Sequence, residues 1–336
     1  MRLGLALGHW GRGPTPGHLD LAREAERIGY HSVWTGESWG SDAFTPLVWI
    51  AAHTSRIHLG TAVAQMAART PVATAMHALT LDHLSGGRMM LGLGLSQPPV
   101  VEGWYGRPFP ASPLAAAREY VEIVRQVLRR EGPVELDGRY HHHPHPGEDG
   151  TVRAEPLKSI THPLRADLPL LLGAEGPKNI AQTTRIADGW LPLYWSPLRT
   201  DVHKEVLTGL AKGFTVAPMA RAQVCDDISE GLLPVKAMLG SYLGGTGHTT
   251  GAFHADLMAR MGYESEARHI QALFAQGRRR EAVLAVPDAF ADEISLVGPR
   301  ERIAERLELW RSGPVTDLLL TSPDLQTLRV MAELVL

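Results

Sequence analysis

The stretch 80–96, TLDHLSGGRMMLGLGLS, constrains the fold more than any other part of this chain. It predicts a helix that ends near Leu84, a tight turn at Gly86 and Gly87, and a buried strand over residues 88–93. Glycine tolerates the positive φ angles that such a turn requires. A strand that is apolar at nearly every position is typical of a parallel sheet that is covered on both faces. The stretch therefore predicts an α/β fold.

Strand and helix patterns alternate along most of the 336 residues. Repeated βαβ units of this kind, without a linker suited to a domain boundary, favour a single (β/α)8 TIM barrel over residues 1–336 rather than a doubly wound sheet. The predicted strands span 2–8, 30–35, 57–63, 88–93, 168–172, 189–193, 215–224 and 317–321. The predicted helices span 19–28, 44–53, 71–84, 114–131, 176–186, 201–213, 228–239, 299–312 and 326–335.

Two segments interrupt this alternation, at about 132–167 and 243–276. Both are too long for ordinary barrel loops, so we expect insertions over the C-terminal face, the first of them forming a lid or a wall of the site. The first contains the histidine-rich run from His141 to His145. Its histidines would all come from one proline-broken loop without a second ligand cluster, so a solvated loop or a site wall is favoured over a metal site.

Composition limits the partners. The net charge of −3 gives no electrostatic reason to expect nucleic acid or an anionic membrane. The single cysteine, Cys225, has no partner for an internal disulfide, which suits a reducing compartment. The chain starts with a strand pattern instead of a secretory signal, and no apolar run approaches the ~18 residues that cross a bilayer. We therefore expect a cytoplasmic protein that acts on a small molecule.

The common catalytic fingerprints are absent from the sequence. It has no GxGxxG that opens a helix after the first strand, no Walker loop, no GxSxG elbow, no HExxH and no paired CxxC. We accordingly predict no metal centre.

A glycine-rich strand exit provides the most informative candidate site. The predicted strand 168–172 leads directly into a helix, with Pro177 suited to the first helical turn. The free N–H groups and the positive dipole end of such a helix attract anions, and Lys178 adds charge. An ordinary strand–helix turn is the alternative. The predicted phosphate-binding residues are Gly173, Ala174, Glu175, Gly176, Pro177, Lys178 and Asn179.

Other strand exits are built from small residues and lie next to polar ones. Small residues let a flat ligand approach the backbone, although packing alone would also explain them. Glu37 follows the second predicted strand, and for this carboxylate a structural salt bridge and a catalytic role are equally plausible. Together with aromatic residues at the mouth, these exits suggest a flat, phosphorylated cofactor. The remaining predicted contacts are Ala62, Val63, Gln65, Gly94 and Ser96, and the aromatic residues are Trp10, Trp39, Trp104 and Tyr105.

Five segments together resemble the bacterial luciferase-like monooxygenase superfamily: GYHSVWTGES, IHLGTAV, TLDHLSGGRMMLGLG, LPLLLGAEGPKN and IADGWLP. The pattern LDxLSGGRxxLGLG is the most specific of these, and the resemblance covers nearly the whole chain. The runs TAVAQMAARTP, VVEGWYGRPF and REYVEIVRQVL are similar to the branch that uses the deazaflavin coenzyme F420. Relatives that use FMN share the core motifs, so FMN is the alternative cofactor.

The resemblance implies a barrel that holds the cofactor at the C-terminal ends of its strands. It implies a non-proline cis peptide between Ala62 and Val63 behind the ring, a phosphate at 173–179, and an acidic residue, Glu37, near the ring. Two positions depart from sugar-phosphate dehydrogenases of the family, because Ser38 replaces a histidine and Gln97 a glutamate. Neither replacement can shuttle a proton near neutral pH, so reduction of an activated double bond or carbonyl is favoured over alcohol oxidation.

Three functions follow from this reasoning. The first is an oxidoreductase that moves a hydride between coenzyme F420 and a small organic substrate, with His9, Tyr105 or water as the proton donor. The second is an FMN-dependent monooxygenase that uses reduced flavin and O2, with a reductase as partner. The third is a non-catalytic flavin-binding protein. The resemblance also implies a homodimer.

Overall fold

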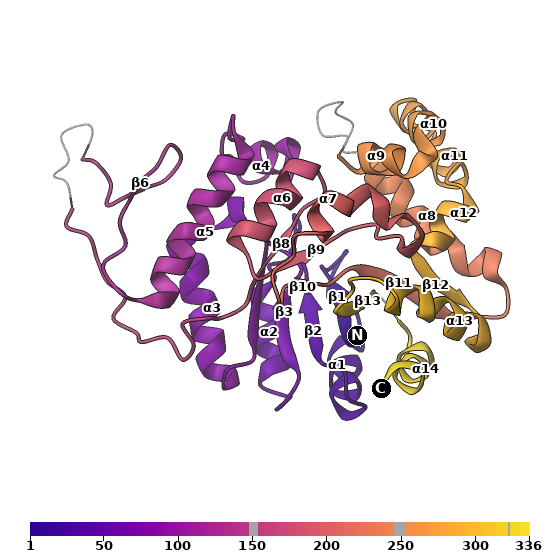
Figure 1. The fold of residues 1–336 in the computed structure, drawn as a ribbon, viewed down its shortest axis with the longest axis horizontal. Helices are drawn as coiled ribbons and strands as arrows, with labels where there is room; N and C mark the ends of the chain where they lie inside the picture. Colours follow the sequence, from indigo (N-terminus) through magenta and orange to yellow (C-terminus); the bar gives the residue numbers. More distant parts are fainter. Residues whose placement is uncertain (148–153, 245–252, 322) are drawn as a thin grey trace.

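The computed structural model describes residues 1–147, 154–244, 253–321 and 323–336, and its centre is a curved parallel sheet surrounded by helices (Figure 1). The strands of this sheet are β1 (Arg2–Gly8), β2 (Ser32–Thr35), β3 (His58–Thr61), β4 (Ala64–Gln65), β5 (Met89–Gly94), β8 (Leu170–Gly173), β9 (Gly189–Leu191), β10 (Thr215–Val216), β11 (Met219–Val224), β12 (Ser295–Gly298) and β13 (Asp317–Thr321).

The sheet closes on itself through one interrupted strand. Its order is β10-β9-β8-β5-β3-β2-β1-β13-β11-β12, with β10 pairing β9 and β11 pairing β13. Between β10 and β11, the Ala217 amide donates to the Trp190 carbonyl and the Leu319 amide donates to the Pro218 carbonyl. Pro218 has no N–H of its own, which interrupts the strand but not the ring. The predicted eight-stranded barrel is confirmed, and β12 is an additional strand beside β11 that the sequence did not predict.

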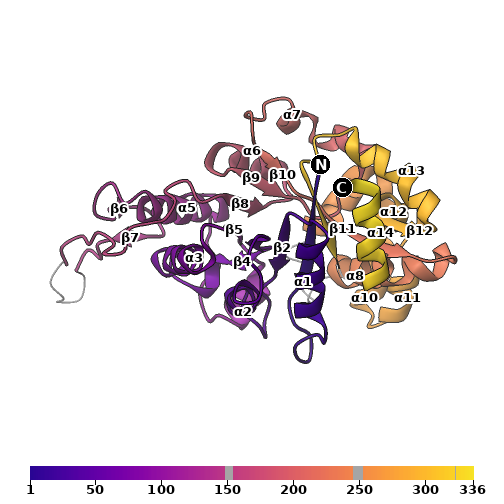
Figure 2. The same cartoon turned by 90° about the horizontal axis from the view of Figure 1, so that it is seen from below.

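Helices surround the sheet in both views (Figures 1 and 2). They are α1 (His18–Arg27), α2 (Phe44–Ala51), α3 (Pro71–Ser85), α4 (Pro98–Gly103), α5 (Pro113–Arg129), α6 (Pro177–Ile186), α7 (Lys204–Leu207), α8 (Ile228–Gly244), α9 (Phe253–Met258), α10 (Glu264–Ala275), α11 (Arg279–Leu284), α12 (Asp288–Glu293), α13 (Arg300–Arg311) and α14 (Leu325–Val335). None of the helices in the described ranges has both the length and the apolar character needed to span a bilayer.

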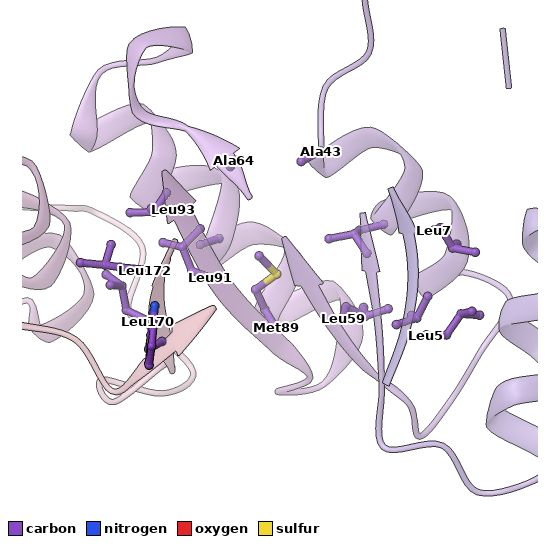
Figure 3. Packing of buried hydrophobic residues seen from close by; sticks show 14 of the residues in the cluster. Leu5, Leu7, Ala43, Leu59, Ala64, Met89, Leu91, Leu93, Leu170 and Leu172 are labelled. Carbon is purple, nitrogen blue, oxygen red and sulfur yellow. The ribbon is translucent and has the colours of Figure 1, made fainter. Parts of the chain in front are cut away.

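Successive side chains along each strand point to opposite faces of the sheet, and this divides the core into two layers. Leucines such as Leu5 and Leu91 belong to the large cluster that packs the sheet against its helices (Figure 3). Their neighbours Ala6 and Met90 belong to a smaller cluster inside the barrel. A Cβ at Gly60 would lie 2.1 Å from Cε3 of Trp34, so glycine gives this indole its space inside the barrel.

The α3–β5 connection explains the most specific sequence pattern. Gly86 and Gly87 have φ angles of 69° and 89°, as the predicted turn requires. The guanidinium of Arg88 lies buried beneath the turn and donates five hydrogen bonds, four of them to backbone carbonyls. The carboxylate of Asp82 accepts from the Met89 amide. The pattern therefore fastens helix to strand at the end of the barrel opposite the predicted site. The five acceptors are Ser85 O, Thr54 Oγ1, Thr54 O, Ile57 O and Ala51 O.

The described part of the segment 132–167 does not lie over the strand ends. Its described part contains a short hairpin, β6 (Leu136–Asp137) and β7 (His142–His143), and lies along the outer side of α5 and α3 (Figure 1). The Glu119 carboxylate on α5 accepts from three hairpin amides, and Arg165 pairs with Asp82 on α3 at 2.5 Å. The expectation of a site wall is therefore wrong for this part. Residues 148–153 lie outside the described residues.

The second insertion does reach the strand ends, because α9 contacts the turn after β8. The helix expected over 201–213 is wrong in extent, since the chain forms a 3-10 segment, Pro197–His203, and only four α-helical residues in α7. Gly209 and Gly213 lie in the expected helix, and glycine disfavours continuation. The short helices α4, α11 and α12 were not predicted.

Candidate active site

The predicted site residues follow β1, β2, β3, β5 and β8, and the carboxyl ends of neighbouring parallel strands lie at one rim of a barrel. His9 follows β1 and is exposed, without a side-chain hydrogen bond among the described residues. Ser96 follows β5 with a positive φ of 66°. The aromatic residues Trp39 and Trp104 are about 60% exposed, which places them in solvent rather than in the core.

The peptide between Ala62 and Val63 is cis, as predicted. The Val63 carbonyl accepts from the Glu37 amide at 3.1 Å, and the Ala62 amide donates to the Thr35 carbonyl at 2.7 Å. The chain then re-enters the sheet as β4, which pairs with the end of β5. These bonds hold a bulge at the exit of β3.

Glycines on β5 and β8 make room for this bulge. A Cβ at Gly94 would lie 2.5 Å from Cγ2 of Val63, and one at Gly92 would lie 1.9 Å from the Thr61 carbonyl oxygen. A Cβ at Gly173 would lie 3.3 Å from Cγ1 of Val63. The space beside these glycines is thus filled by protein. The structure supports the packing interpretation of Gly92 and Gly94, and a cofactor contact at Gly94 or Gly173 stays a prediction.

Replacing Gly94 by alanine is expected to destabilise the protein by about 2 kcal/mol, because the added methyl group overpacks against Val63. Thermal unfolding should show the lower transition temperature. Adding Val63→Ala to Gly94→Ala should recover most of the loss, since it removes the clashing atom. A double variant no more stable than Gly94→Ala would contradict this account.

Glu37 is engaged in a buried ion pair. Its side chain is 3% exposed, and Nη2 of Arg69 lies 2.5 Å from its Oε1. Nη1 of Arg69 and the Gln65 amide both donate to Oε2, at 2.8 and 2.7 Å. Both carboxylate oxygens are therefore occupied by strong donors. This geometry favours a positioning role for Glu37 at the bulge over proton transfer.

Breaking this ion pair is expected to lower the free energy of unfolding by about 2 kcal/mol. This is less than for a fully buried pair, because the Arg69 side chain retains some exposure to solvent. Arg69→Met should lower the midpoint of urea unfolding, since it leaves the Glu37 carboxylate buried without its cation. The pair Glu37→Gln/Arg69→Met should be more stable than Arg69→Met alone. Equal midpoints for the single and double variants would show that the unpaired Glu37 carboxylate is not the cause of the lost stability.

Gln65 presents an unused hydrogen-bond acceptor at the rim. Its Nε2 donates to the Glu37 carbonyl at 3.0 Å, while its Oε1 is buried without a hydrogen-bond partner among the described residues. A buried polar atom without a partner costs free energy unless a ligand or water supplies the missing bond. A ring N–H of a flat heterocycle would satisfy it.

The turn after β8 has the features of an anion site. Gly176 is the N-cap of α6 and provides no side-chain cap, and Pro177 occupies the first helical position. The first-turn amides of a helix have no intrahelical acceptors. The carbonyls of Ala174 and Glu175 instead accept from the side chains of Trp190 and Arg260, at 2.7 and 2.8 Å. The turn is thus fixed through its carbonyls.

His254 is a site residue that the sequence analysis missed. It lies on α9, and its Nδ1 is 2.7 Å from Oε2 of Glu175. Its Nε2 is 3.3 Å from Nε2 of Gln97. The side chains of His254 and Glu175 are only 10% and 17% exposed. The structure therefore joins the exits of β5 and β8 through one histidine of the second insertion.

Two tyrosines surround this histidine. The rings of Tyr194 and Tyr242 lie 5.6 and 5.2 Å from the His254 ring, both edge-on. The Tyr194 hydroxyl is buried without a hydrogen-bond partner among the described residues, and burial raises the pKa of Tyr194 well above its usual value.

Tyr105, a predicted proton donor, interacts with a different part of the site. Burial and, to a smaller extent, the Glu37 carboxylate raise the pKa of Tyr105, which indicates that Tyr105 lies within electrostatic reach of Glu37.

Within the described ranges, no three His, Cys, Asp or Glu side chains are arranged to hold a metal ion. The histidines of the first insertion lie elsewhere: His141 packs edge-on against Tyr120 of α5, and His142 contacts Asp137 at 3.0 Å.

Comparisons with known proteins identify a family with this fold. The family model of the luciferase-like monooxygenases matches residues 6–317. A Mycobacterium tuberculosis protein named "Putative coenzyme F420-dependent oxidoreductase Rv3520c" is 45% identical over 344 aligned residues, covering 100% of this chain and 99% of the relative.

Two solved structures have the same fold. The coenzyme F420-dependent tetrahydromethanopterin reductase from Methanopyrus kandleri superposes with a TM-score of 0.78 at 22% identity, covering 99% of this chain and 97% of the other. An F420-dependent secondary alcohol dehydrogenase in complex with an F420-acetone adduct gives 0.73 at 16% identity, covering 99% and 98%. With the family model matching more than nine-tenths of its length, this chain belongs to the luciferase-like monooxygenase family.

Proposed function

We propose that this protein is an oxidoreductase that transfers a hydride between coenzyme F420 and a small organic substrate. The observation that carries the proposal is the 45% identity, over the whole chain, to a relative whose name specifies that cofactor. The free acceptor on Gln65 and the uncapped start of α6 fit a flat heterocycle with a phosphate.

When bound in its reduced form, the deazaflavin would supply a hydride from ring carbon C5. The chain's own residues bind and orient it. Gln65 Oε1 would accept from the ring, the bulge at Ala62 and Val63 would back it, and the amides of residues 173–179 would hold the phosphate. Gly94 and Ser96 complete the proposed contacts at the exit of β5.

A hydride acceptor such as an activated double bond or carbonyl also takes up one proton. We assign its delivery to His254, because Glu175 holds Nδ1 and Nε2 faces the exit of β5, where the substrate would take the place of the Gln97 amide that now lies 3.3 Å from it. His9 and Tyr105 are the alternative donors. Glu37 is retained as a positioning residue for the bulge, and its catalytic role stays a prediction.

Cofactor titration tests the proposal. Binding to the protein should quench the fluorescence of oxidised F420 or shift its absorption. The reduced form should be reoxidised anaerobically by a member of a panel of enones and ketones. Tight FMN binding without affinity for F420, together with substrate-dependent O2 consumption, would overturn it in favour of a monooxygenase. A bound deazaflavin that stays inert toward every donor and acceptor would support a non-catalytic binding protein.

A homodimer is part of the proposal. Large apolar side chains are exposed on the neighbouring helices α2 and α3, including Trp49 at 59%, Met76 at 58% and Leu84 at 69%. Exposed apolar groups of this size suit a protein contact. A cytoplasmic location and a reductase that supplies reduced cofactor stay predictions.

A further inference from the structure

Arg221 on β11 lies on the inner face of the barrel. Its neighbours in the strand, Ala220 and Ala222, belong to the cluster that packs the sheet against its helices. Met219, two residues before Arg221, packs instead against the cluster inside the barrel. Because alternate side chains of a strand point to the same face, the side chain of Arg221 points inward as that of Met219 does. It lies beside Thr321, the last residue of β13.

The guanidinium of Arg221 has hydrogen-bond donors that the protein does not use. Its Nη2 donates to Oε1 of Gln223 at 3.1 Å, whereas its Nε is buried without a hydrogen-bond partner among the described residues. Asp324 is near enough to act on its charge, but Oδ1 of this carboxylate accepts from the Thr327 amide at 2.6 Å and caps α14. Arg88, which is also buried without a carboxylate partner, uses five donors.

Burial is what makes the unused donor of Arg221 informative. An exposed arginine without an ion pair is solvated by water and indicates no ligand. The Nε of Arg221 is closed off from solvent, so its missing hydrogen bond costs free energy. Burial also lowers the pKa of Arg221, as expected for a cation whose charge is not compensated. The side chain as a whole is only partly buried, so a ligand at the mouth can reach the guanidinium.

The wall of the barrel beside Arg221 leaves room for a small ligand. Thr321 pairs with Arg221 on one side and with Ala6 of β1 on the other. Two residues further along, β1 ends at the exposed Gly8, where an added Cβ would meet no atom within 4 Å. Small side chains and open space at the carboxyl ends of strands are typical of a ligand site in a barrel.

Arg221 also lies across the mouth from the bulge that we propose behind the cofactor ring. The strands β2, β1 and β13 separate β3 from β11 on one side, and β5, β8 and β9 separate them on the other side. The two strands therefore lie on opposite walls of the closed sheet. The bulge at Ala62 and Val63 covers one face of the ring, so a substrate has to approach the other face. The substrate then lies between the ring and the wall that carries Arg221.

We propose that Arg221 binds a carboxylate of the substrate, so that the substrates are small organic acids with an activated double bond or carbonyl. The inference rests on the proposed function, because it places the substrate against the deazaflavin. A guanidinium presents its N–H groups in a planar fork that matches a carboxylate. Gln223 holds one arm of this fork and leaves the others for the ligand. A neutral carbonyl oxygen would leave the charge of Arg221 without a counter-charge.

The experiment compares acids with their methyl esters as acceptors of hydride from reduced F420. The probes are 4-oxopent-2-enoate and cinnamate, each beside its methyl ester. From the contribution of a hydrogen bond between charged groups, the wild type should prefer the acid about 30-fold in kcat/KM. Arg221→Gln should lose this preference through a higher KM for the acid, with kcat nearly unchanged. Arg221→Lys should recover part of it, because lysine keeps the charge but not the fork.

A binding measurement gives a second readout that needs no turnover. The probe is 3-phenylpropanoate, which has the carboxylate of cinnamate but no double bond to reduce. Titration calorimetry of the protein loaded with oxidised F420 should show that Arg221→Gln weakens its binding about 30-fold. The dissociation constant of F420 itself should stay the same, because the proposed cofactor contacts lie on other strands.

The matched control is Arg23→Gln, which removes an exposed arginine from α1 and should keep the wild-type preference for acids. A merely structural role of Arg221 would lower the activity toward acid and ester alike. Three results would overturn the inference and leave the proposed function intact: equal use of acid and ester by the wild type, a preference that survives in Arg221→Gln, or reoxidation by neutral ketones but by neither acid. Reoxidation by no acceptor at all would overturn both.

Discussion

Replacing Arg88 by methionine is expected to lower the free energy of unfolding by about 4 kcal/mol, more than any other single change considered for this fold. The methionine preserves much of the buried volume but removes five donors. A hydrogen bond from a charged group contributes about 1.5–3 kcal/mol, and a buried carbonyl left without a donor costs about 1–3 kcal/mol. Denaturant unfolding monitored by tryptophan fluorescence measures the loss.

Two comparisons show whether the cost arises from these contacts. Arg329→Met removes an arginine whose side chain is 53% exposed beside Glu24, and such a surface pair is worth less than about 1 kcal/mol. Arg88→Lys keeps the charge but not the planar fork, so its stability should fall between wild type and methionine. A methionine variant as stable as the Arg329 control would show that the buried guanidinium only offsets its own desolvation, a cost that already lowers the pKa of Arg88.

The same variant separates two interpretations of the LSGGR pattern. Arg88 precedes β5, whereas Gly94 and Ser96 follow it at the opposite end of the strand. If the pattern is structural, the folded Arg88→Met protein should bind cofactor with an unchanged dissociation constant. A tenfold weaker constant under folding conditions would place the pattern in the binding site after all.

Local patterns in the sequence were sufficient to predict the barrel. Apolar runs of strand length and the turn glycines each depend on neighbours a few residues away, and both are present in the structure. The cis bond at Ala62 was predicted by the resemblance, because no spacing rule identifies it. The break at Pro218 could have been predicted from its missing N–H.

The parts that the sequence did not predict depend on distant partners. His254 lies in a segment without helical or strand periodicity, and only the folded chain brings it to Glu175, 79 positions earlier. The Arg69 partner of Glu37 is likewise 32 residues away. The first insertion has the same loop-like composition whether it lies over the rim or, as found, along α5. Contacts with residues that are distant in sequence decide where such segments lie.

Replacing His254 by asparagine is expected to lower kcat about 1,000-fold for a substrate that the wild type reduces. General acid catalysis by a positioned side chain contributes about 10²–10⁴-fold, and asparagine cannot donate a proton from an ionisable group. Dissociation constants for the cofactor should change by no more than a few-fold, because α9 meets the turn through the carboxylate of Glu175 and not through its amides. Steady-state kinetics and fluorescence titration give the two quantities separately.

A purely structural role for His254 makes different predictions. A structural role would lower the midpoint of unfolding of His254→Asn and leave the kcat of the folded variant unchanged, whereas loss of a proton donor would lower kcat in a variant that stays folded. Glu175→Gln should have an intermediate kcat, since its amide oxygen can still accept from Nδ1 but lacks the negative charge of the carboxylate. His269→Asn, which removes an exposed histidine from α10 of the same insertion, should match the wild type. If His254→Asn keeps the wild-type kcat and loses only stability, the proton comes from Tyr105, His9 or water, and His254 only joins the insertion to the barrel.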